Sequence, residues 1–175
     1  MGLNIDAPFI FISDTINKLK ANKSRYQGMT AKTGVPWYFI ACIHQLEAGG
    51  SFMKHLHNGD WLIKRTVHVP VGRPADSNPP YTWECSAYDA LVNCKGLNKV
   101  TDWSIPHMLF LLEGYNGYGY RVYHPTVKSP YLWGKTNHYT KGKYIADNHF
   151  DPNAVSQQIG AAVILKGLLY DEARS

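Results

Sequence analysis

The sequence of 175 residues has no apolar run long enough to cross a membrane. A membrane-spanning helix needs about 18 consecutive apolar residues, whereas the stretches at 108–112 and 161–165 are only of the size found in protein cores. No basic residue precedes the first apolar stretch, which Asp6 and Asp14 flank, and a secretory signal has the opposite pattern. We therefore expect no signal peptide and no stable insertion into a membrane.

Cysteine is scarce as well: the chain has only Cys42, Cys85 and Cys94. No two cysteines are separated by two residues, which excludes a zinc ribbon and a Cys-x-x-Cys redox motif. If Cys85 and Cys94 share a helix, about 13.5 Å of helix axis separates them, which is too far for a disulfide. We expect all three thiols to be reduced, as in a protein made in the cytosol.

Several functional motifs are also missing. Neither Gly-x-Ser-x-Gly nor a phosphate-binding Gly-rich loop occurs, so a serine hydrolase and a nucleoside triphosphatase are not expected. The net charge is +5, but no basic run exceeds two residues, which does not favour a nucleic-acid-binding module. Aromatic residues are abundant at 13%, with twelve tyrosines and five tryptophans. A basic surface rich in these side chains suits a polyanion, a carbohydrate or a single-stranded nucleic acid.

The spacing of apolar residues predicts a mainly α fold (α+β) in one domain over 1–175, with an N-terminal helix and connection in 1–33 and a core in 34–170. A small β-hairpin, with its return strand at Thr66–Val69, a proline-rich loop and a long aromatic loop interrupt the helices. The expected elements are helices at 9–22, 35–48, 81–94, 103–116 and 154–170, a polar connection at 23–34, the hairpin at 52–71, the proline-rich loop at 72–80 and the aromatic loop at 117–153.

Glu47 is the first candidate catalytic residue. It lies in the last turn of the expected helix 35–48, which Pro36 begins and Gly49 ends. Partial burial and the negative end of the helix dipole are both expected to raise the pKa of this carboxyl group. A carboxylic acid that stays protonated near neutral pH can serve as a general acid.

Asp60 and Thr66, with five residues between them, form a second feature. Asn58 and Gly59 predict a tight turn just before Asp60, and Thr66 lies on the expected return strand of the hairpin. A glutamate at the end of a helix, an aspartate in the following hairpin and, after five intervening residues, a threonine resemble the catalytic set of phage-type muramidases. That resemblance implies that Asp60 stabilises charge or positions water and that Thr66 orients the water. The gap of twelve residues between Glu47 and Asp60 is longer than is usual in those enzymes.

A later segment carries a second resemblance. LLEGYNGYGYR at 111–121 is similar to the segment of goose-type lysozymes and lytic transglycosylases that lines the cleft near the catalytic glutamate. The resemblance implies that Tyr115, Asn116 and Tyr120 bind substrate, with Tyr120 stacking on a sugar ring. Glu113 could line the same cleft. The segment between lacks the Gly-Leu-Met-Gln-like sequence of those families, and RTVHVPVGRP stands in its place.

The stretch from about Gly34 to Leu168, which includes PWYFIACIHQLEAGGSFMKHLHNGD, resembles phage and prophage endolysins of the lysozyme superfamily. The resemblance implies a lysozyme-like fold and an enzyme that cleaves the β-1,4 bond between N-acetylmuramic acid and N-acetylglucosamine, by hydrolysis or as a lytic transglycosylase. It further implies a monomer that needs no cofactor, acts on cell-wall peptidoglycan and stays in the host cytoplasm until it is released to the wall.

Two alternatives remain open. His55, His57 and Asp60, together with His68, have the residue types of a zinc site, and residues 55 and 57 would share one face of a strand. Three such ligands and a water would favour a zinc-dependent peptidoglycan peptidase or amidase. The other alternative is a glycosidase of the chitinase or chitosanase type, because the sequence alone does not select the glycan.

Overall fold

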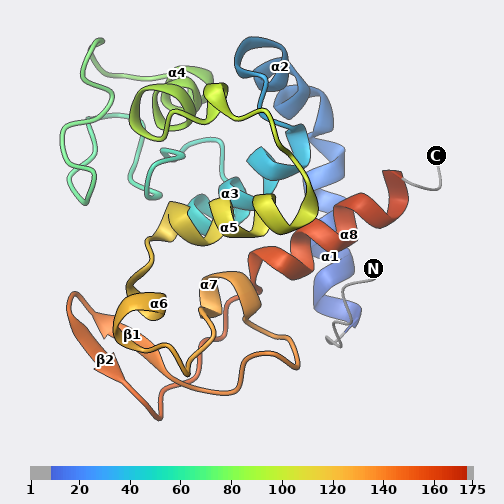
Figure 1. Ribbon diagram of the computed structural model, residues 1–175. Helices are drawn as coiled ribbons and strands as arrows, with labels where there is room; N and C mark the ends of the chain where they lie inside the picture. Colours follow the sequence, from blue (N-terminus) through green and yellow to red (C-terminus); the bar gives the residue numbers. More distant parts are fainter. Residues whose placement is uncertain (1–8, 173–175) are drawn as a thin grey trace. The chain divides into compact units, whose positions relative to one another are not determined.

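The structure is a computed structural model that describes residues 9–172, and it is mainly α-helical with one small antiparallel hairpin (Figure 1). The mainly α class predicted from the sequence is therefore confirmed. The elements are α1 (Phe9–Ala21), α2 (Lys23–Thr33), α3 (Trp37–Ala48), α4 (Trp83–Tyr88), the π-helix η1 (Asp89–Cys94), the 3-10 helix η2 (Leu97–Lys99), α5 (Ile105–Asn116), α6 (Gly119–Tyr123), α7 (Pro130–Trp133), β1 (Lys143–Ala146), β2 (His149–Asp151) and α8 (Ala161–Glu172).

Contacts between residues divide the chain into two compact units. Unit 2 is continuous and contains residues 18–104, whereas unit 1 combines residues 9–17 with residues 105–172. The boundaries at 17/18 and 104/105 differ from the expected division near residue 33. The expectation of a single domain stays a prediction.

The core of unit 2 is built around α3. Phe39, Ile40 and Ile43 of this helix are fully buried, as the apolar spacing of the sequence predicts. Gly49 ends α3 in a left-handed conformation with φ 60°, and its N–H donates to Gln45 O at 3.0 Å. The helix and its end are therefore predicted correctly from the sequence.

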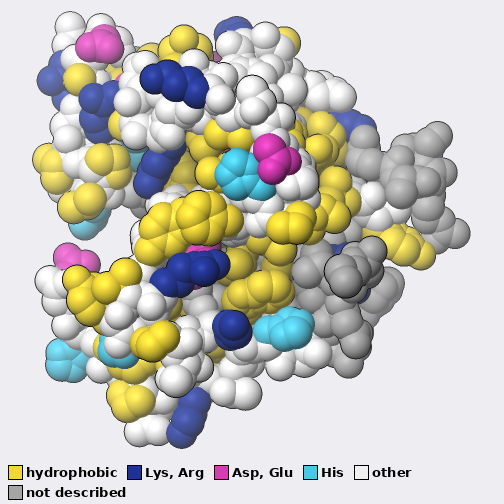
Figure 2. All heavy atoms as spheres, viewed as in Figure 1, with side chains coloured by type: hydrophobic (Ala, Val, Ile, Leu, Met, Phe, Trp, Pro, Cys, Tyr) yellow, Lys and Arg dark blue, Asp and Glu magenta, His cyan; other side chains and the backbone are white. Residues whose placement is uncertain are grey.

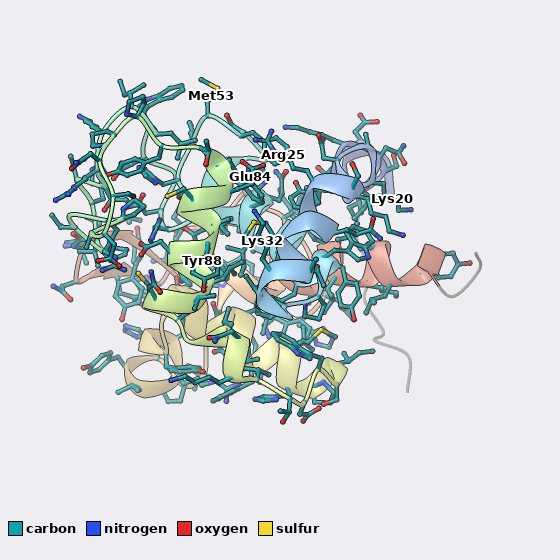
Figure 3. The ribbon with its side chains drawn as sticks, turned by 90° about the horizontal axis from the view of Figure 1, so that it is seen from above. Lys20, Arg25, Lys32, Met53, Glu84 and Tyr88 are labelled. Carbon is teal, nitrogen blue, oxygen red and sulfur yellow. The ribbon has the colours of Figure 1, made fainter. Side chains whose placement is uncertain are left out.

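The expectation of a polar connection at 23–34 is wrong, because α2 spans nearly all of it. Tyr26, Met29 and Thr33 lie at helical spacing on the buried face of α2. The Tyr26 hydroxyl hydrogen-bonds His44 Nδ1 at 2.8 Å and so joins α2 to α3. On the outer side, Arg25 of α2 points to Glu84 of α4, with Nε and Oε1 2.6 Å apart (Figure 3).

The expected hairpin at 52–71 is also wrong. Residues 51–82 form irregular loops, and within them strand-like pairing is limited to one bridge between Lys54 and Trp61. The segment Thr66–Val69 is not a strand: the consecutive N–H groups of Val67 and His68 both donate to the side chain of Asp60, whereas in a strand they would point to opposite sides. The proline-rich loop at 72–80 is present as expected.

Unit 1 is built on α5, α7 and α8. Leu112 of α5 and Ile164 and Leu165 of α8 are fully buried. The C-terminal helix begins at Ala161 rather than near residue 154, because Gly160 passes directly against the backbone at Leu132, where a Cβ atom would collide with the carbonyl oxygen. Gly160 N–H donates to Gly134 O at 2.9 Å, which fixes the crossing of the two segments.

The segment 117–153 is more regular than expected, since α6, α7 and the β1–β2 hairpin lie within it. The two strands pair antiparallel, with Tyr144 opposite Phe150, and Asn148 turns the chain with φ 57°. Tyr120 of α6 packs against this hairpin, which Figure 1 shows beside α6. The fold therefore contains one small hairpin among the described residues, but 143–151 forms it and not the predicted segment 52–71.

On the surface in view, Lys and Arg side chains are scattered among neutral and hydrophobic ones (Figure 2). Within residues 9–172, no helix combines the length and the apolar character that crossing a bilayer requires.

Candidate functional site

Glu47 lies in the last turn of α3, as predicted, and its side chain is partly buried between two buried neighbours, Leu46 and Ala48. The C-terminal end of a helix concentrates unpaired carbonyl groups and is electrically negative. A carboxyl group there is favoured in its neutral, protonated form. The raised pKa expected for Glu47 stays a prediction.

The turn before Asp60 packs directly against the end of α3. Gly59 has φ 79°, and a Cβ atom on it would collide with the carbonyl oxygen of Glu47. The turn is closed by the Gly59 N–H, which donates to His55 O at 2.9 Å, and by the His55 N–H, which donates to Asp60 O at 2.7 Å. The twelve residues between Glu47 and Asp60 therefore form a loop whose last residue, Gly59, packs against the end of α3.

The carboxylate of Asp60 is held in a fixed position. Its Oδ2 accepts the N–H groups of Val67 at 2.8 Å and of His68 at 3.0 Å, and its Oδ1 lies 2.7 Å from His68 Nδ1. Burial opposes ionisation, but the hydrogen bonds from His68 and Val67 outweigh it and lower the pKa of Asp60 to about 2. Asp60 therefore carries a negative charge at every pH at which the protein is expected to act.

Thr66 holds the loop that follows Asp60. It is 2% exposed, and its hydroxyl donates to Pro70 O while accepting the Arg73 N–H at 2.9 Å. The Thr66 N–H also donates to Arg73 O at 2.9 Å, and the Gly72 N–H donates to Thr66 O at 2.8 Å. Because its only proton is taken by Pro70, the hydroxyl has a structural task here in place of the predicted orientation of water.

The histidines of the proposed zinc site do not converge with Asp60. His55 and His57 are buried, and their Nδ1 atoms lie 2.8 Å and 3.3 Å from the same Ser86 Oγ. His68, in contrast, is largely exposed and binds Asp60. The structure therefore separates the four residues into two groups with different partners.

His57 belongs to a buried polar network centred on Asp89. The carboxylate of Asp89, which is 3% exposed, accepts from His57 Nε2 at 2.7 Å, Arg73 Nε at 3.0 Å and Asn93 Nδ2 at 3.0 Å. Burial opposes the charge, but the bonds from Arg73, Asn93 and His57 outweigh it and keep the pKa of Asp89 below its ordinary value. Burial lowers the pKa of His57, which therefore stays neutral and donates its Nε2–H to Asp89.

This network contains the one group of metal-ligand type found among residues 9–172, namely His57, Asp89 and Cys94. Arg73 already occupies the open side of Asp89 with two nitrogen atoms and neutralises its charge. Burial and the neighbouring Asp89 carboxylate raise the pKa of Cys94, so its thiol is protonated. The arrangement is that of an internal ion pair, and a dication would have to displace Arg73.

No sequence pattern points to Asp89, because its partners Arg73 and His57 lie 16 and 32 residues earlier in the chain. The π-helix η1, which presents the side chains of Asp89, Asn93 and Cys94 to the network, has no sequence signature either. An aspartate inside an apolar helical segment was the only available signal, since a buried carboxylate requires partners.

The predicted substrate-binding residues belong to unit 1. Asn116 is exposed at the end of α5, and Tyr115 is buried. Tyr120 is 6% exposed, its hydroxyl accepts the Tyr144 N–H at 3.1 Å, and the rings of Tyr144 and Phe150 pack against it edge to face. The buried ring of Tyr120 therefore offers no face to a sugar. A cleft shared with Glu47 of unit 2 stays a prediction.

An exposed aromatic side chain lies next to Asp60. Trp61 is 54% exposed, and the ammonium group of Lys54 lies 5.2 Å from the centre of its ring. This tryptophan, rather than Tyr120, has the exposure that stacking on a sugar requires.

Comparison of the chain with models of protein families, with curated proteins and with solved structures gives no match.

Proposed function

We propose that the protein is a glycosidase that cleaves the β-1,4 bond of peptidoglycan glycans, with Glu47 as the general acid and Asp60 as its charged partner. The observation that carries this proposal is the packing of the Gly59–Asp60 turn against the carbonyl group of Glu47. This packing brings the ionised Asp60 to the end of α3, where the partly buried Glu47 lies. Paired carboxyl groups with different protonation states are what glycosidic cleavage requires.

The different surroundings of Glu47 and Asp60 give the two carboxyl groups different roles in the proposed reaction. Asp60 is fixed by three hydrogen bonds and has a pKa of about 2, so it is an anion and not a proton donor. Glu47, at the negative end of α3, donates its proton to the glycosidic oxygen as the bond breaks. The charge of Asp60 then stabilises the oxocarbenium-like transition state or a water that attacks it.

The loop around Asp60 supplies the binding surface. Thr66 fixes the loop from within, and Trp61 presents its ring beside Asp60. An exposed indole ring packs on the apolar face of a sugar, which orients the chain for cleavage. The positive net charge of the protein adds a long-range attraction to the anionic wall.

The decisive experiment compares the wild type with Glu47→Gln on purified peptidoglycan and identifies the products by mass spectrometry. The glutamine keeps the size of the side chain but has no acidic proton, so turnover should fall by at least about 100-fold while the circular dichroism spectrum stays unchanged. The matched control is Glu84→Gln, which changes a surface carboxylate of the same unit and should stay fully active. Wild-type turnover by Glu47→Gln would refute the proposal.

The products also discriminate the alternatives. A reducing muramic end indicates hydrolysis, and an anhydro end indicates a lytic transglycosylase. A cut peptide together with loss of activity in a chelator would instead establish the zinc peptidase or amidase. Cleavage of chitin or chitosan in preference to peptidoglycan would reassign the substrate to the chitinase or chitosanase type.

A further inference from the structure

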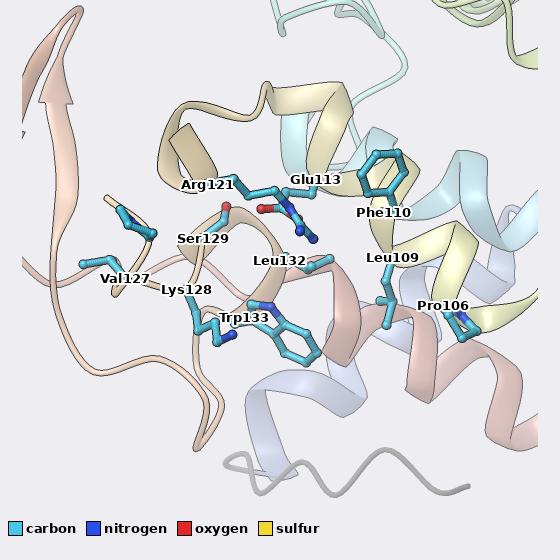
Figure 4. Close-up of a pocket in the computed structure, with 11 residues that line it drawn as sticks. Pro106, Leu109, Phe110, Glu113, Arg121, Val127, Lys128, Ser129, Leu132 and Trp133 are labelled. Carbon is cyan, nitrogen blue, oxygen red and sulfur yellow. The ribbon is translucent and has the colours of Figure 1, made fainter. Parts of the chain in front are cut away.

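Unit 1 contains a pocket of about 350 Å³ whose lining residues have no role in the proposed cleavage. It lies between α5, α6, the segment 125–129 and α7 (Figure 4). Its size suits a small organic molecule or a single residue of a larger ligand.

Ser129 provides the first sign that the pocket is built to bind something. The residue is only 3% exposed, and its hydroxyl has no hydrogen-bond partner. Leaving a buried hydroxyl unpaired destabilises a fold by an amount comparable to a lost hydrogen bond. In Figure 4 the hydroxyl of Ser129 points toward the carboxylate of Glu113. A ligand that hydrogen-bonds Ser129 would satisfy it.

Glu113 and Arg121 form the polar floor. The side chain of Glu113 is 6% exposed, and its Oε2 lies 2.7 Å from both Nε and Nη2 of Arg121. Both contacts from Arg121 go to Oε2, so Oε1 is the oxygen that can accept a hydrogen bond from a ligand. The ion pair uses one edge of the guanidinium group and leaves the Nη1–Nη2 edge, which matches the two oxygens of a carboxylate.

Lys128 gives the pocket a surplus of positive charge. No hydrogen bond or ion pair with the described part of the chain holds its ammonium group. The charged residues of the lining are Glu113, Arg121 and Lys128, so the lining carries one positive charge more than negative. Figure 4 shows the end of Lys128 beside the ring of Trp133 and the guanidinium group of Arg121 beside Glu113. The charge complement of such a pocket is a monoanion.

The remaining walls are apolar. Leu109 and Phe110 of α5 and Leu132 and Trp133 of α7 contribute side chains to the lining. These surfaces favour a ligand with a hydrocarbon part beside its charged group. The pocket thus combines sites for a carboxylate, for a neutral hydrogen-bond donor and for an apolar side chain.

We propose that this pocket binds the C-terminal residue of a peptide, through its carboxylate, its backbone N–H and an apolar side chain. The carboxylate pairs with Arg121 and Lys128, and the N–H donates to Glu113 Oε1 while Ser129 bonds the terminal group. A free amino acid has the same carboxylate, but its ammonium group makes it neutral overall, so it matches the surplus charge less well. The proposal does not rest on the glycosidase activity.

The test is an NMR titration of the ¹⁵N-labelled protein at low ionic strength with three probes. N-acetyl-leucine represents a peptide C-terminus, leucine represents a free amino acid, and N-acetyl-leucinamide lacks the carboxylate. N-acetyl-leucine should shift the amide signals of residues 113, 121 and 128–133. It should bind about tenfold tighter than the amide, because the charge-assisted hydrogen bonds are lost with the carboxylate.

Two variants test the assigned contacts. Ser129→Ala removes the unpaired hydroxyl and should weaken binding about fivefold without lowering the melting temperature. Lys128→Gln should weaken binding by a similar factor, whereas Lys141→Gln, on an exposed lysine outside the lining, should not. Arg121 is kept, because its loss would leave the buried Glu113 carboxylate unpaired.

Four results would overturn the proposal: equal affinity for N-acetyl-leucine and its amide, tighter binding of leucine, unchanged binding by both Ser129→Ala and Lys128→Gln, or no shifts up to the solubility limit of the probe. N-acetylglucosamine serves as the contrasting ligand, and its preferential binding would reassign the pocket to sugars. Lytic activity is measured in parallel and should be the same in both variants, so a failure here is distinct from a failure of the proposed glycosidase.

Discussion

His44 is a titratable side chain that the fold accepts only in its neutral form. It is fully buried, with Nδ1 2.8 Å from the Tyr26 hydroxyl and Nε2 3.0 Å from Ser51 O. A neutral imidazole makes both hydrogen bonds, because the Tyr26 hydroxyl donates to Nδ1 and the Nε2–H donates to the Ser51 carbonyl oxygen. Burial lowers the pKa of His44 to about 4, and the nearby charges of Lys18 and Arg25 act in the same direction.

Acid should therefore destabilise the protein in a defined range. In the unfolded chain histidine binds a proton near pH 6.5, whereas in the folded chain His44 does so only near pH 4. The contribution of His44 to the free energy of unfolding is complete above pH 6.5. It is lost as the pH falls toward 4, and the total loss is about 3 kcal/mol. Urea denaturation at pH 4 to 7 measures this slope.

The control for this prediction separates His44 from the other histidines. His44→Gln should be less stable at pH 7 but should lose the part of the slope that His44 contributes, with the part from the buried His57 remaining, while His68→Gln, on a largely exposed side chain, should keep the whole slope. An identical slope in His44→Gln and the wild type would contradict the assignment.

Asp60→Asn tests the charge of Asp60 without removing its loop contacts. The amide oxygen can still accept the N–H groups of Val67 and His68, and the NH₂ group faces a His68 nitrogen that can accept. The melting temperature should change little, but wall lysis should fall by about tenfold or more. Full activity of both Asp60→Asn and Asp60→Ala would leave Glu47 as the single catalytic carboxyl group.

Trp61 and Tyr120 should respond to mutation in opposite ways. Trp61→Ala removes an exposed ring beside Asp60 and should weaken lysis at an unchanged melting temperature. Tyr120→Ala removes a buried ring and the acceptor for the Tyr144 N–H, which should cost about 3 kcal/mol of stability. The folded fraction of Tyr120→Ala should keep its activity. The reverse pattern would restore Tyr120 as the sugar-binding residue.

Among the elements, the apolar helices are predictable and the polar ones are not. The spacing of Phe39, Ile43 and Leu46 predicts α3, and the same kind of pattern predicts α5 and α8. In α2 the three buried positions lie among lysines, an arginine and a glycine, so composition hides the helical spacing. The local signal was present, but the tertiary contact of Tyr26 with His44 selects the helix.

Two glycines, one inside α2 and one just after it, allow a paired test of that helix. Gly28 lies inside α2 and has nothing within 4 Å of the position that a methyl group would take, so Gly28→Ala should raise stability by about 0.5–1 kcal/mol. Gly34 has equal space but φ +75°, so Gly34→Ala should lower stability by about 1 kcal/mol. Chemical denaturation measures both. A destabilised Gly28→Ala variant would argue that 23–33 is not a helix in solution.

The hairpin and the candidate site show why the remaining features could not be predicted. A tight turn at Gly59 and a β-branched segment after it are typical of a hairpin, but here a side chain, Asp60, takes the place of the second strand. The proximity of Glu47 and Asp60 depends on the close packing of Gly59, which no spacing reveals. The sequence therefore allowed candidate residues that are close along the chain, such as Asp60 and Thr66, to be grouped. It did not allow the distant partners of Asp89 to be found.

For the whole molecule, the net charge of +5 predicts salt-sensitive attachment to the wall. The screening length falls from about 10 Å at 0.1 M salt to about 3 Å at 1 M, so long-range attraction to an anionic polymer weakens. Cosedimentation with peptidoglycan should decrease between these salt concentrations, while cleavage of a short uncharged oligosaccharide should not. Salt-independent attachment would show that contact residues, and not net charge, hold the protein on the wall.

The discontinuous unit 1 has a consequence for synthesis on the ribosome. Ile16 of α1 packs against Gly167 of α8, and 151 residues separate the two positions. At roughly 5–20 residues per second, about 8–30 s pass between the synthesis of Ile16 and that of Gly167, and the continuous unit 2 is completed within this interval. The nascent chain therefore passes through a stage in which unit 2 can be folded and residues 9–17 of α1 still lack their partner α8. During that interval a chaperone that shields apolar helices would have its greatest effect on the yield of this protein.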